Sequence, residues 1–241
     1  MLNLSKTILL FLAGLTIISC QVDTKRKNDY SIQGIDVSHY QKQVDLNLVA
    51  EQNISFAFIK STEGLEFKDS MFNKNWSLSK KANMVRGAYH FFRPTLDVKT
   101  QFENYKNHTS LMVGDMPPIL DVEVYDGVSD DSLTARVQRW LTLAEDYYQV
   151  KPVLYTYQKF FNKTLQGKFN AYPLWIARYN RFFEPNLVNS EWKFWQYGNK
   201  GNLDGVEGYI DFNVFSGSLE ELKDMTIQSN YEQEAIELVA P

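Results

Sequence analysis

Short runs of β-branched, aromatic and aliphatic residues alternate with amphipathic stretches along the chain from about residue 32 onward. Strands separated by helical stretches are typical of a parallel α/β sheet or barrel. The runs predict strands at residues 34–38, 56–61, 85–92, 118–124, 153–157, 174–178, 193–197 and 208–215.

Helical periodicity is clearest between residues 131 and 149. Apolar side chains recur there at helical spacing, at Leu133, Val137, Trp140, Leu141, Ala144 and Tyr148. This stripe belongs to the core and carries no chemistry. After residue 178 the helical signal fades, and turns rich in Gly and Asn join the last strands, with one short closing helix at 218–224. The pattern therefore predicts an α/β fold, a modified TIM-like (β/α)5(β)3 barrel.

The first twenty residues have the pattern of an export signal. Lys6 precedes an apolar run from Thr7 to Ile18, which is shorter than the ~20 residues that a membrane-spanning helix needs. The run is followed by Ser19 and Cys20, and Ile17-Ile-Ser-Cys20 resembles a bacterial lipobox. We therefore expect a lipoprotein signal peptide at 1–19 and a lipid on Cys20. The alternative is an ordinary signal peptide with an incidental cysteine, and either one exports the protein.

The remaining chain divides into a tether, one domain and a tail. Residues 20–31 are polar and lack periodicity, so we expect a tether that links the lipidated cysteine to a barrel over 32–225, with a polar tail over 226–241. We expect a monomer in the cell envelope, attached to a membrane through Cys20; the sequence leaves open which membrane. Cys20 is the only cysteine, so no intramolecular disulfide can form.

Charge argues against a nucleic-acid partner. The chain has 25 basic and 29 acidic residues and a net charge of -4, and the basic residues are scattered rather than gathered in a stripe.

Acidic residues near the ends of predicted strands are the candidates for chemistry, because barrel enzymes place their active sites at the C-terminal ends of the strands. Strand alternation puts Asp121 and Glu123 on one face, with their side chains roughly 6 to 7 Å apart at their roots. Such a pair in an apolar cleft suits glycosidic bond hydrolysis. The alternatives are a solvated strand end and a site for a hard cation. In a closed barrel the first and last strands are neighbours, so Asp36 and Asp211 are expected side by side.

Other chemistries lack their signatures. The histidines His39, His90 and His108 show no metal-ligand spacing, and we assign them no role. No glycine-rich phosphate loop or Gly-x-Ser-x-Gly elbow is present. The sequence therefore predicts no bound metal and no cofactor, and it argues against nucleotide-dependent and serine-hydrolase activities.

Six segments, in order along the chain, carry a family resemblance. From about residue 34 to residue 215 the sequence resembles the family 25 glycoside hydrolases, lysozymes of the N-acetylmuramidase type. The matching segments are Gly34-Ile-Asp-Val-Ser-His-Tyr-Gln41, Phe58-Ile-Lys-Ser-Thr-Glu-Gly64, Arg86-Gly-Ala-Tyr-His-Phe-Phe92, Pro117-Pro-Ile-Leu-Asp-Val-Glu123, Leu174-Trp-Ile-Ala177 and Phe194-Trp-Gln-Tyr-Gly198. The family's barrel has five β/α units and three closing strands, as the periodicity predicts.

The resemblance also implies residue roles. Glu123 corresponds to the general acid/base, and Asp121 corresponds to the group that orients the substrate's N-acetyl group and stabilises an oxazolinium-like intermediate. Asp36 and Asp211 correspond to supporting acids. Departures from the usual family pattern fall at Lys42, Leu46 and Ser61, and they leave all four acids in place.

Further residues are candidates for glycan contacts. Aromatic residues in strand-end segments can stack on sugars or pack in the core; they are Tyr89, Tyr155, Trp175, Trp195 and Tyr197. Lys60 and Glu63 are expected either to bind the glycan or to pair with each other.

The expected reaction is hydrolysis of the β-1,4 bond between N-acetylmuramic acid and N-acetylglucosamine in peptidoglycan. A chitinase or another N-acetylhexosaminidase is the first alternative, since substrate assistance needs only a 2-acetamido group. The segment Pro118-Ile-Leu-Asp121 lacks the additional aspartates of family 18 chitinases, which favours the muramidase. The second alternative is a non-catalytic glycan-binding lipoprotein, which the presence of all four acids disfavours.

Overall fold

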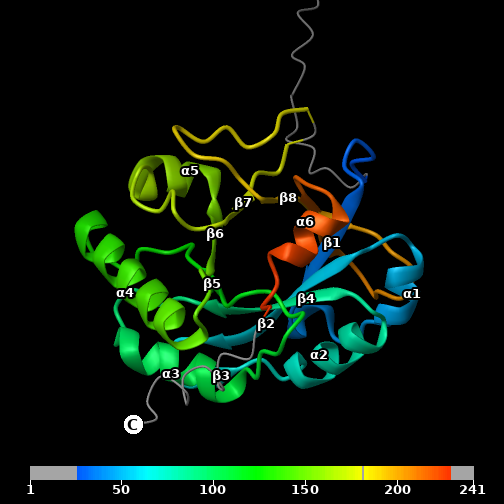
Figure 1. Cartoon of the computed structure of the whole chain (residues 1–241), viewed down its shortest axis with the longest axis horizontal. Coiled ribbons are helices and arrows are strands. Elements are labelled where there is room, and N and C mark those ends of the chain that lie inside the picture. Colours follow the sequence, from blue (N-terminus) through cyan, green and yellow to red (C-terminus); the bar gives the residue numbers. More distant parts are fainter. Residues whose placement is uncertain (1–25, 181, 229–241) are drawn as a thin grey trace, which may run out of the picture.

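The computed structural model describes residues 26–180 and 182–228, so the predicted signal peptide, Cys20 and most of the predicted tail lie outside the described residues. The strands form one sheet in the order β1-β9-β8-β7-β6-β5-β4-β2-β3, and β1 also pairs with β2, which closes a barrel (Figure 1). The two-residue strand β3 pairs with the end of β2. The strands are β1 (Ile32–Val37), β2 (Phe56–Glu63), β3 (Phe67–Lys68), β4 (Val85–Phe91), β5 (Ile119–Asp121), β6 (Val153–Tyr157), β7 (Leu174–Ala177), β8 (Phe194–Gly201) and β9 (Ile210–Phe215).

Helices follow each of the first five barrel strands, none lies between the last three strands among the described residues, and the short helix α6 follows the last strand. The helical segments are η1 (His39–Gln41), α1 (Leu46–Glu51), α2 (Phe72–Lys81), α3 (Val98–His108), α4 (Asp130–Tyr148), α5 (Gln158–Phe160), the π-helical turn η2 (Phe161–Leu165) and α6 (Leu219–Asp224). Strand β9 runs antiparallel to both of its neighbours, β8 and β1. The predicted (β/α)5(β)3 barrel is therefore confirmed.

Strand alternation divides the buried side chains into two cores. Residues such as Phe58, Ile119 and Phe194 fill the inside of the barrel, whereas their strand neighbours pack between the barrel and the helices. Gly34 lies inside, where an added Cβ would sit 2.3 Å from ring carbons of Phe56. The glycine is therefore required by the close approach of that ring.

Both ends of the domain differ from the expected boundaries. Arg26 donates hydrogen bonds to the carbonyl oxygens of Gln52 and Asn53, and the Tyr30 ring packs against Trp192 and Trp195 on the outside of the barrel. The last part of the expected tether, residues 26–31, is therefore part of the domain, because its aromatic and long cationic side chains have partners there.

The expected tail also begins inside the domain. Thr226 and Ile227 are buried. The backbone of Ile227 exchanges hydrogen bonds with Asp115, which accepts, and with Gly114, which donates to it. These residues continue the packing that α6 begins at the end of the barrel where β9 leaves it.

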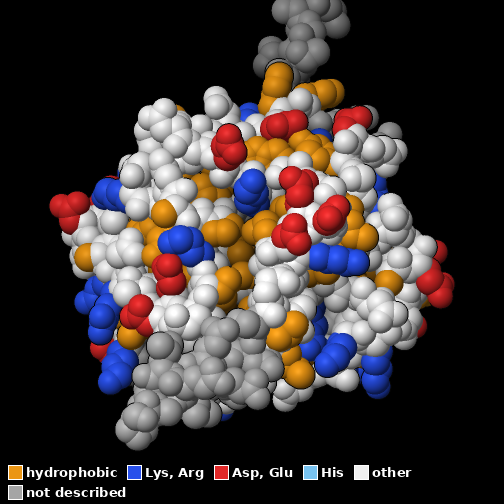
Figure 2. All heavy atoms as spheres, in the orientation of Figure 1, with side chains coloured by type: hydrophobic (Ala, Val, Ile, Leu, Met, Phe, Trp, Pro, Cys, Tyr) orange, Lys and Arg blue, Asp and Glu red, His pale blue; other side chains and the backbone are white. Residues whose placement is uncertain are grey.

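The face of the molecule that carries α6 has charges of both signs. Acidic and basic side chains are interspersed there (Figure 2), without a continuous basic stripe. Within residues 26–180 and 182–228, no helix has both the length and the apolar character needed to cross a bilayer.

Candidate active site

The four predicted acids meet at the end of the barrel where the parallel strands finish. Asp36 lies directly opposite Asp211 in the pairing of β1 with β9. Asp121 is the last residue of β5, and Glu123 follows it beyond the strand end. All four line one pocket of about 230 Å³. The predicted juxtaposition is confirmed, although β5 is shorter than the predicted strand 118–124.

Asp36 is held by two side-chain amides. Its Oδ2 accepts hydrogen bonds from Gln196 Nε2 at 2.8 Å and Asn213 Nδ2 at 2.7 Å. Burial raises the pKa of Asp36 to about 6, the two amide hydrogen bonds oppose that rise, and the charge of Glu123 adds to it. Two hydrogen bonds therefore fix the orientation of Asp36, and its raised pKa of about 6 leaves it mostly ionised at neutral pH.

Asp121 and Glu123 interact with each other. Burial raises the pKa of both groups, and the charge of Glu123 raises the pKa of Asp121 further. The hydrogen bond with Asp121 and the charge of Lys60 partly offset the rise for Glu123. Among the described residues, Asp121 Oδ1 is buried and has no hydrogen-bond partner. The pair is therefore poised to hold one proton, with one acceptor oxygen free for a ligand.

Asp211 is the acid least able to ionise. Burial, followed by the charges of Asp36 and Glu123, raises its pKa to about 9. At neutral pH it is protonated, so it can donate a hydrogen bond as well as accept one.

Three of the five candidate aromatic residues line this pocket: Tyr89, Tyr155 and Trp175. All three are buried, so they form the floor of the pocket rather than an open stacking wall. The expectation for Trp195 and Tyr197 was wrong. Both point out of the barrel, where Trp195 Nε1 donates to the carbonyl of Arg178 and both rings pack in the outer core.

Alternation along β8 explains this correction. Phe194 and Gln196 face inward, so the aromatic residues between and after them must face outward.

Sequence reasoning missed several polar residues that lie in the pocket or are buried beneath it. Gln196 Oε1 accepts hydrogen bonds from the hydroxyls of Tyr155 and Tyr179, at 2.8 and 2.9 Å. Asn213 Oδ1 accepts one from Trp175 Nε1 at 2.8 Å. Asn213 was detectable, because it lies two residues after Asp211 and therefore shares its face.

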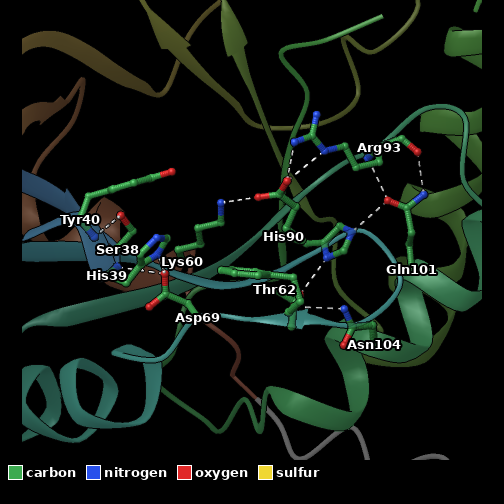
Figure 3. A network of polar contacts seen from close by, with 12 residues as sticks. Ser38, His39, Tyr40, Lys60, Thr62, Asp69, His90, Arg93, Gln101 and Asn104 are labelled. Carbon is green, nitrogen blue, oxygen red and sulfur yellow. Dashed lines mark hydrogen bonds and ion pairs between the residues drawn. The ribbon is translucent and has the colours of Figure 1, made fainter. Parts of the chain in front are cut away.

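Lys60 and Glu63 pair with each other, which was one of the two expected arrangements. Lys60 Nζ donates to Glu63 Oε2 at 2.7 Å, and Arg93 Nε donates to Glu63 Oε1 at 2.9 Å (Figure 3). Lys60 lines the pocket and is buried. Glu63 therefore fixes the position of the cation that faces Asp121 and Glu123.

Two histidines have structural partners. His90 is buried between Thr62 and Gln101 (Figure 3), and burial lowers its pKa to about 4. His39 Nδ1 lies 2.7 Å from Asp69 Oδ2, beside the exposed rim residue Tyr40. Neither histidine belongs to a metal site: among residues 26–180 and 182–228, no group of three or more His, Cys, Asp or Glu side chains could hold a metal ion.

Comparison with known proteins identifies the family. The model of "Glycosyl hydrolases family 25" matches residues 35–206. The chain belongs to this family. A family 25 glycosyl hydrolase structure from Bacillus anthracis superposes with a TM-score of 0.78 and 33% identity, covering 84% of this chain and 97% of that one.

Two curated proteins are also similar in sequence. "Lysozyme M1" of Streptomyces globisporus is 32% identical over 217 residues, covering 79% of this chain and 70% of that protein. "Uncharacterized protein YegX" of Escherichia coli (strain K12) is 39% identical over 199 residues, covering 80% of this chain and 73% of that protein. The chain is therefore a glycosidase by family, as the acid cluster predicts.

Proposed function

We propose that this family 25 glycosidase is a lysozyme that hydrolyses the β-1,4 bond between N-acetylmuramic acid and N-acetylglucosamine in peptidoglycan. The observation that carries the proposal is the pairing of Asp121 with Glu123 in a buried cleft that also holds Asp36 and Asp211. The similarity to lysozymes supports it.

The first chemical step uses the substrate's own acetamido group. Asp121 Oδ1 is buried and unpartnered among the described residues, so it accepts the acetamido N–H and turns the acetamido oxygen toward the anomeric carbon. That contact favours ionised Asp121 and leaves the shared proton on Glu123. Glu123 gives this proton to the glycosidic oxygen as the C–O bond breaks and the acetamido oxygen bonds to the anomeric carbon. The product is an oxazolinium ion paired with the Asp121 carboxylate.

Water completes the reaction. Glu123, now ionised, takes a proton from a water molecule whose oxygen attacks the anomeric carbon and reopens the oxazolinium ring. Gln196 and Asn213 fix Asp36 by hydrogen bonds. Asp36 and the protonated Asp211 together form the polar side of the cleft. Lys60 balances the negative charge that passes between Asp121 and Glu123.

Two alternatives share this cleft. A chitinase-like enzyme would use the same acetamido chemistry on a different glycan, and a non-catalytic protein would bind glycan without cleaving it. One experiment separates all three.

The purified domain is incubated with peptidoglycan and with chitin oligomers, and the new reducing ends are identified. We expect ends of N-acetylmuramic acid from the wild type and a loss of about 10²- to 10⁴-fold in Glu123→Gln, because the amide cannot donate a proton to the leaving oxygen. Glu66→Gln, at an exposed site, serves as the matched control. Equal release by wild type and Glu123→Gln would refute the role of Glu123, and N-acetylglucosamine ends alone would favour the chitinase.

We also propose that Cys20 carries a lipid and holds the enzyme in the cell envelope. The support is the order of Lys6, the apolar run and Ile17-Ile-Ser-Cys20 at the start of the chain.

A further inference from the structure

A second pocket adjoins the acid cleft on one side of Glu123. Its volume is about 530 Å³. Glu123 and Tyr155 line both this pocket and the cleft, so a glycan bound at the acids extends directly into it. The other walls are Tyr157, the start of α5 at residues 158–159, and residues 177–180, which run from the end of β7 into the following loop and include Arg178.

Cations gather around this pocket. Lys159 lines it, and Lys163 lies four residues later on the continuous α5–η2 segment, where such a spacing brings side chains close together. Both lysines are exposed, and neither forms an ion pair with a carboxylate among the described residues. Two like charges at this spacing repel each other unless an anion lies between them.

Lys163 also lies close to the aromatic side chains at this pocket. Its Nζ is 4.8 Å from the centroid of the Tyr125 ring. Burial raises the pKa of Tyr157 on the pocket wall, as do the charges of Tyr125 and Glu123, and the charge of Lys163 opposes that rise. Among the described residues, Glu123 is the only carboxylate that lines the pocket, and in the proposed mechanism it carries a proton when the enzyme is ready to react. The pocket therefore favours an anionic ligand.

We propose that this pocket binds a carboxylate carried by the muramyl residue of the substrate, with Lys159 as the main contact and Lys163 as a supporting charge. The proposal rests on the proposed function and adds the basis of its specificity. N-acetylglucosamine has a neutral hydroxyl at carbon 3, whereas muramic acid carries a lactyl ether there. A charged pocket beside Glu123 therefore favours peptidoglycan over chitin, which the acetamido chemistry alone cannot distinguish.

The carboxylate has two sources. In strands without peptides the lactyl group itself is ionised, whereas in strands with stem peptides the lactyl group is an amide and the charge lies on the peptide. The test therefore uses three substrates: peptide-free glycan strands, peptide-bearing strands, and peptide-free strands whose lactyl carboxylates have been converted to methylamides.

The variants are Lys159→Ala, the double variant Lys159→Ala with Lys163→Ala, and Lys168→Ala as the matched control. Lys168 is an exposed lysine just beyond η2 that contacts Thr134 and does not line the pocket. We expect kcat/KM on a charged substrate to fall about two- to fivefold in the single variant and about tenfold in the double variant. The loss should shrink at high salt, and Lys168→Ala should match the wild type.

Each outcome is decisive. A loss on peptide-free strands assigns the lactyl carboxylate, and a loss confined to peptide-bearing strands assigns the stem peptide. Unchanged rates on both charged substrates, or an equal loss on the methylamide strands, would overturn the pocket's role while the wild-type activity stands. A wild type that releases no muramic acid ends would instead remove the proposed function, and this inference with it.

Discussion

At the residue scale, the cleft depends on neutral amides as much as on its acids. Gln196 and Asn213 both donate to Asp36 Oδ2, and each accepts a hydrogen bond from an aromatic residue of the pocket floor. Burial of a carboxylate is costly unless it is hydrogen-bonded. The amides therefore keep Asp36 ionisable in a place where Asp211, which has no such donors among the described residues, retains its proton.

The raised pKa of Asp211 predicts how the free energy of unfolding depends on pH. Its pKa is about 9 in the folded protein and about 4 in an unfolded chain. Between these values the folded state binds a proton that the unfolded state lacks, so the free energy of unfolding falls as pH rises through this window. Asp211→Asn should remove that fall and be about 1 to 3 kcal/mol more stable than the wild type at pH 8.

Thermal or urea unfolding at pH 5, 7 and 9 measures the effect. The difference between Asp211→Asn and the wild type should grow with pH, whereas the exposed control Asp204→Asn should show no such trend. A difference independent of pH would contradict protonation of Asp211.

The sequence predicted the acids better than their surroundings, for a physical reason. An acid among strand-forming residues is conspicuous, and the closed barrel placed Asp36 beside Asp211. Amides such as Gln196 are common and carry no pattern of their own. The expectation for Trp195 failed because closeness to a strand end does not tell which face a side chain takes; alternation from Phe194 decides that.

At the element scale, the barrel strands were predicted to within a few residues because their apolar runs are bounded by turns. The largest differences are in β5, which ends at Asp121, and in β8, which continues to Gly201. In both cases the sequence pattern does not show where strand pairing stops. Packing between β1 and β2 is tighter than any pattern indicates, since Phe56 occupies the space next to Gly34.

Gly34→Ala tests this packing. The new methyl group would overlap the Phe56 ring, so we expect a loss of about 1 to 3 kcal/mol in the free energy of unfolding. Phe56→Leu should relieve the overlap, and the double variant should therefore be more stable than the sum of the two single effects predicts. Urea unfolding of the four proteins measures this coupling. Simple additivity would show that the ring does not set the requirement for glycine.

At the scale of the whole molecule, the folded domain extends past the predicted boundary at both of its ends. Residues 26–31 and 226–228 pack on the barrel although their composition resembles a linker. Local composition cannot reveal this, because their partners, such as Trp192 and Asp115, are distant in sequence.

Cys20→Ser tests the proposed anchor. Because the thiol is the site of lipid attachment, we expect the variant to leave the membrane fraction and appear in the soluble fraction, with its glycosidase activity unchanged. Immunoblots of fractionated cells and an activity assay on each fraction measure this. Membrane association equal to that of the wild type would refute the lipid on Cys20.

The docking of Arg26 against Gln52 and Asn53 limits where the enzyme can work. With Cys20 lipidated as proposed, only six residue steps separate the lipid from a fixed point on the barrel, a span of at most about 20 Å. A domain of this size is about 40 Å across. The cleft then reaches only the glycan strands nearest the bilayer, so such an enzyme trims the wall from its membrane-facing side and leaves distant layers untouched.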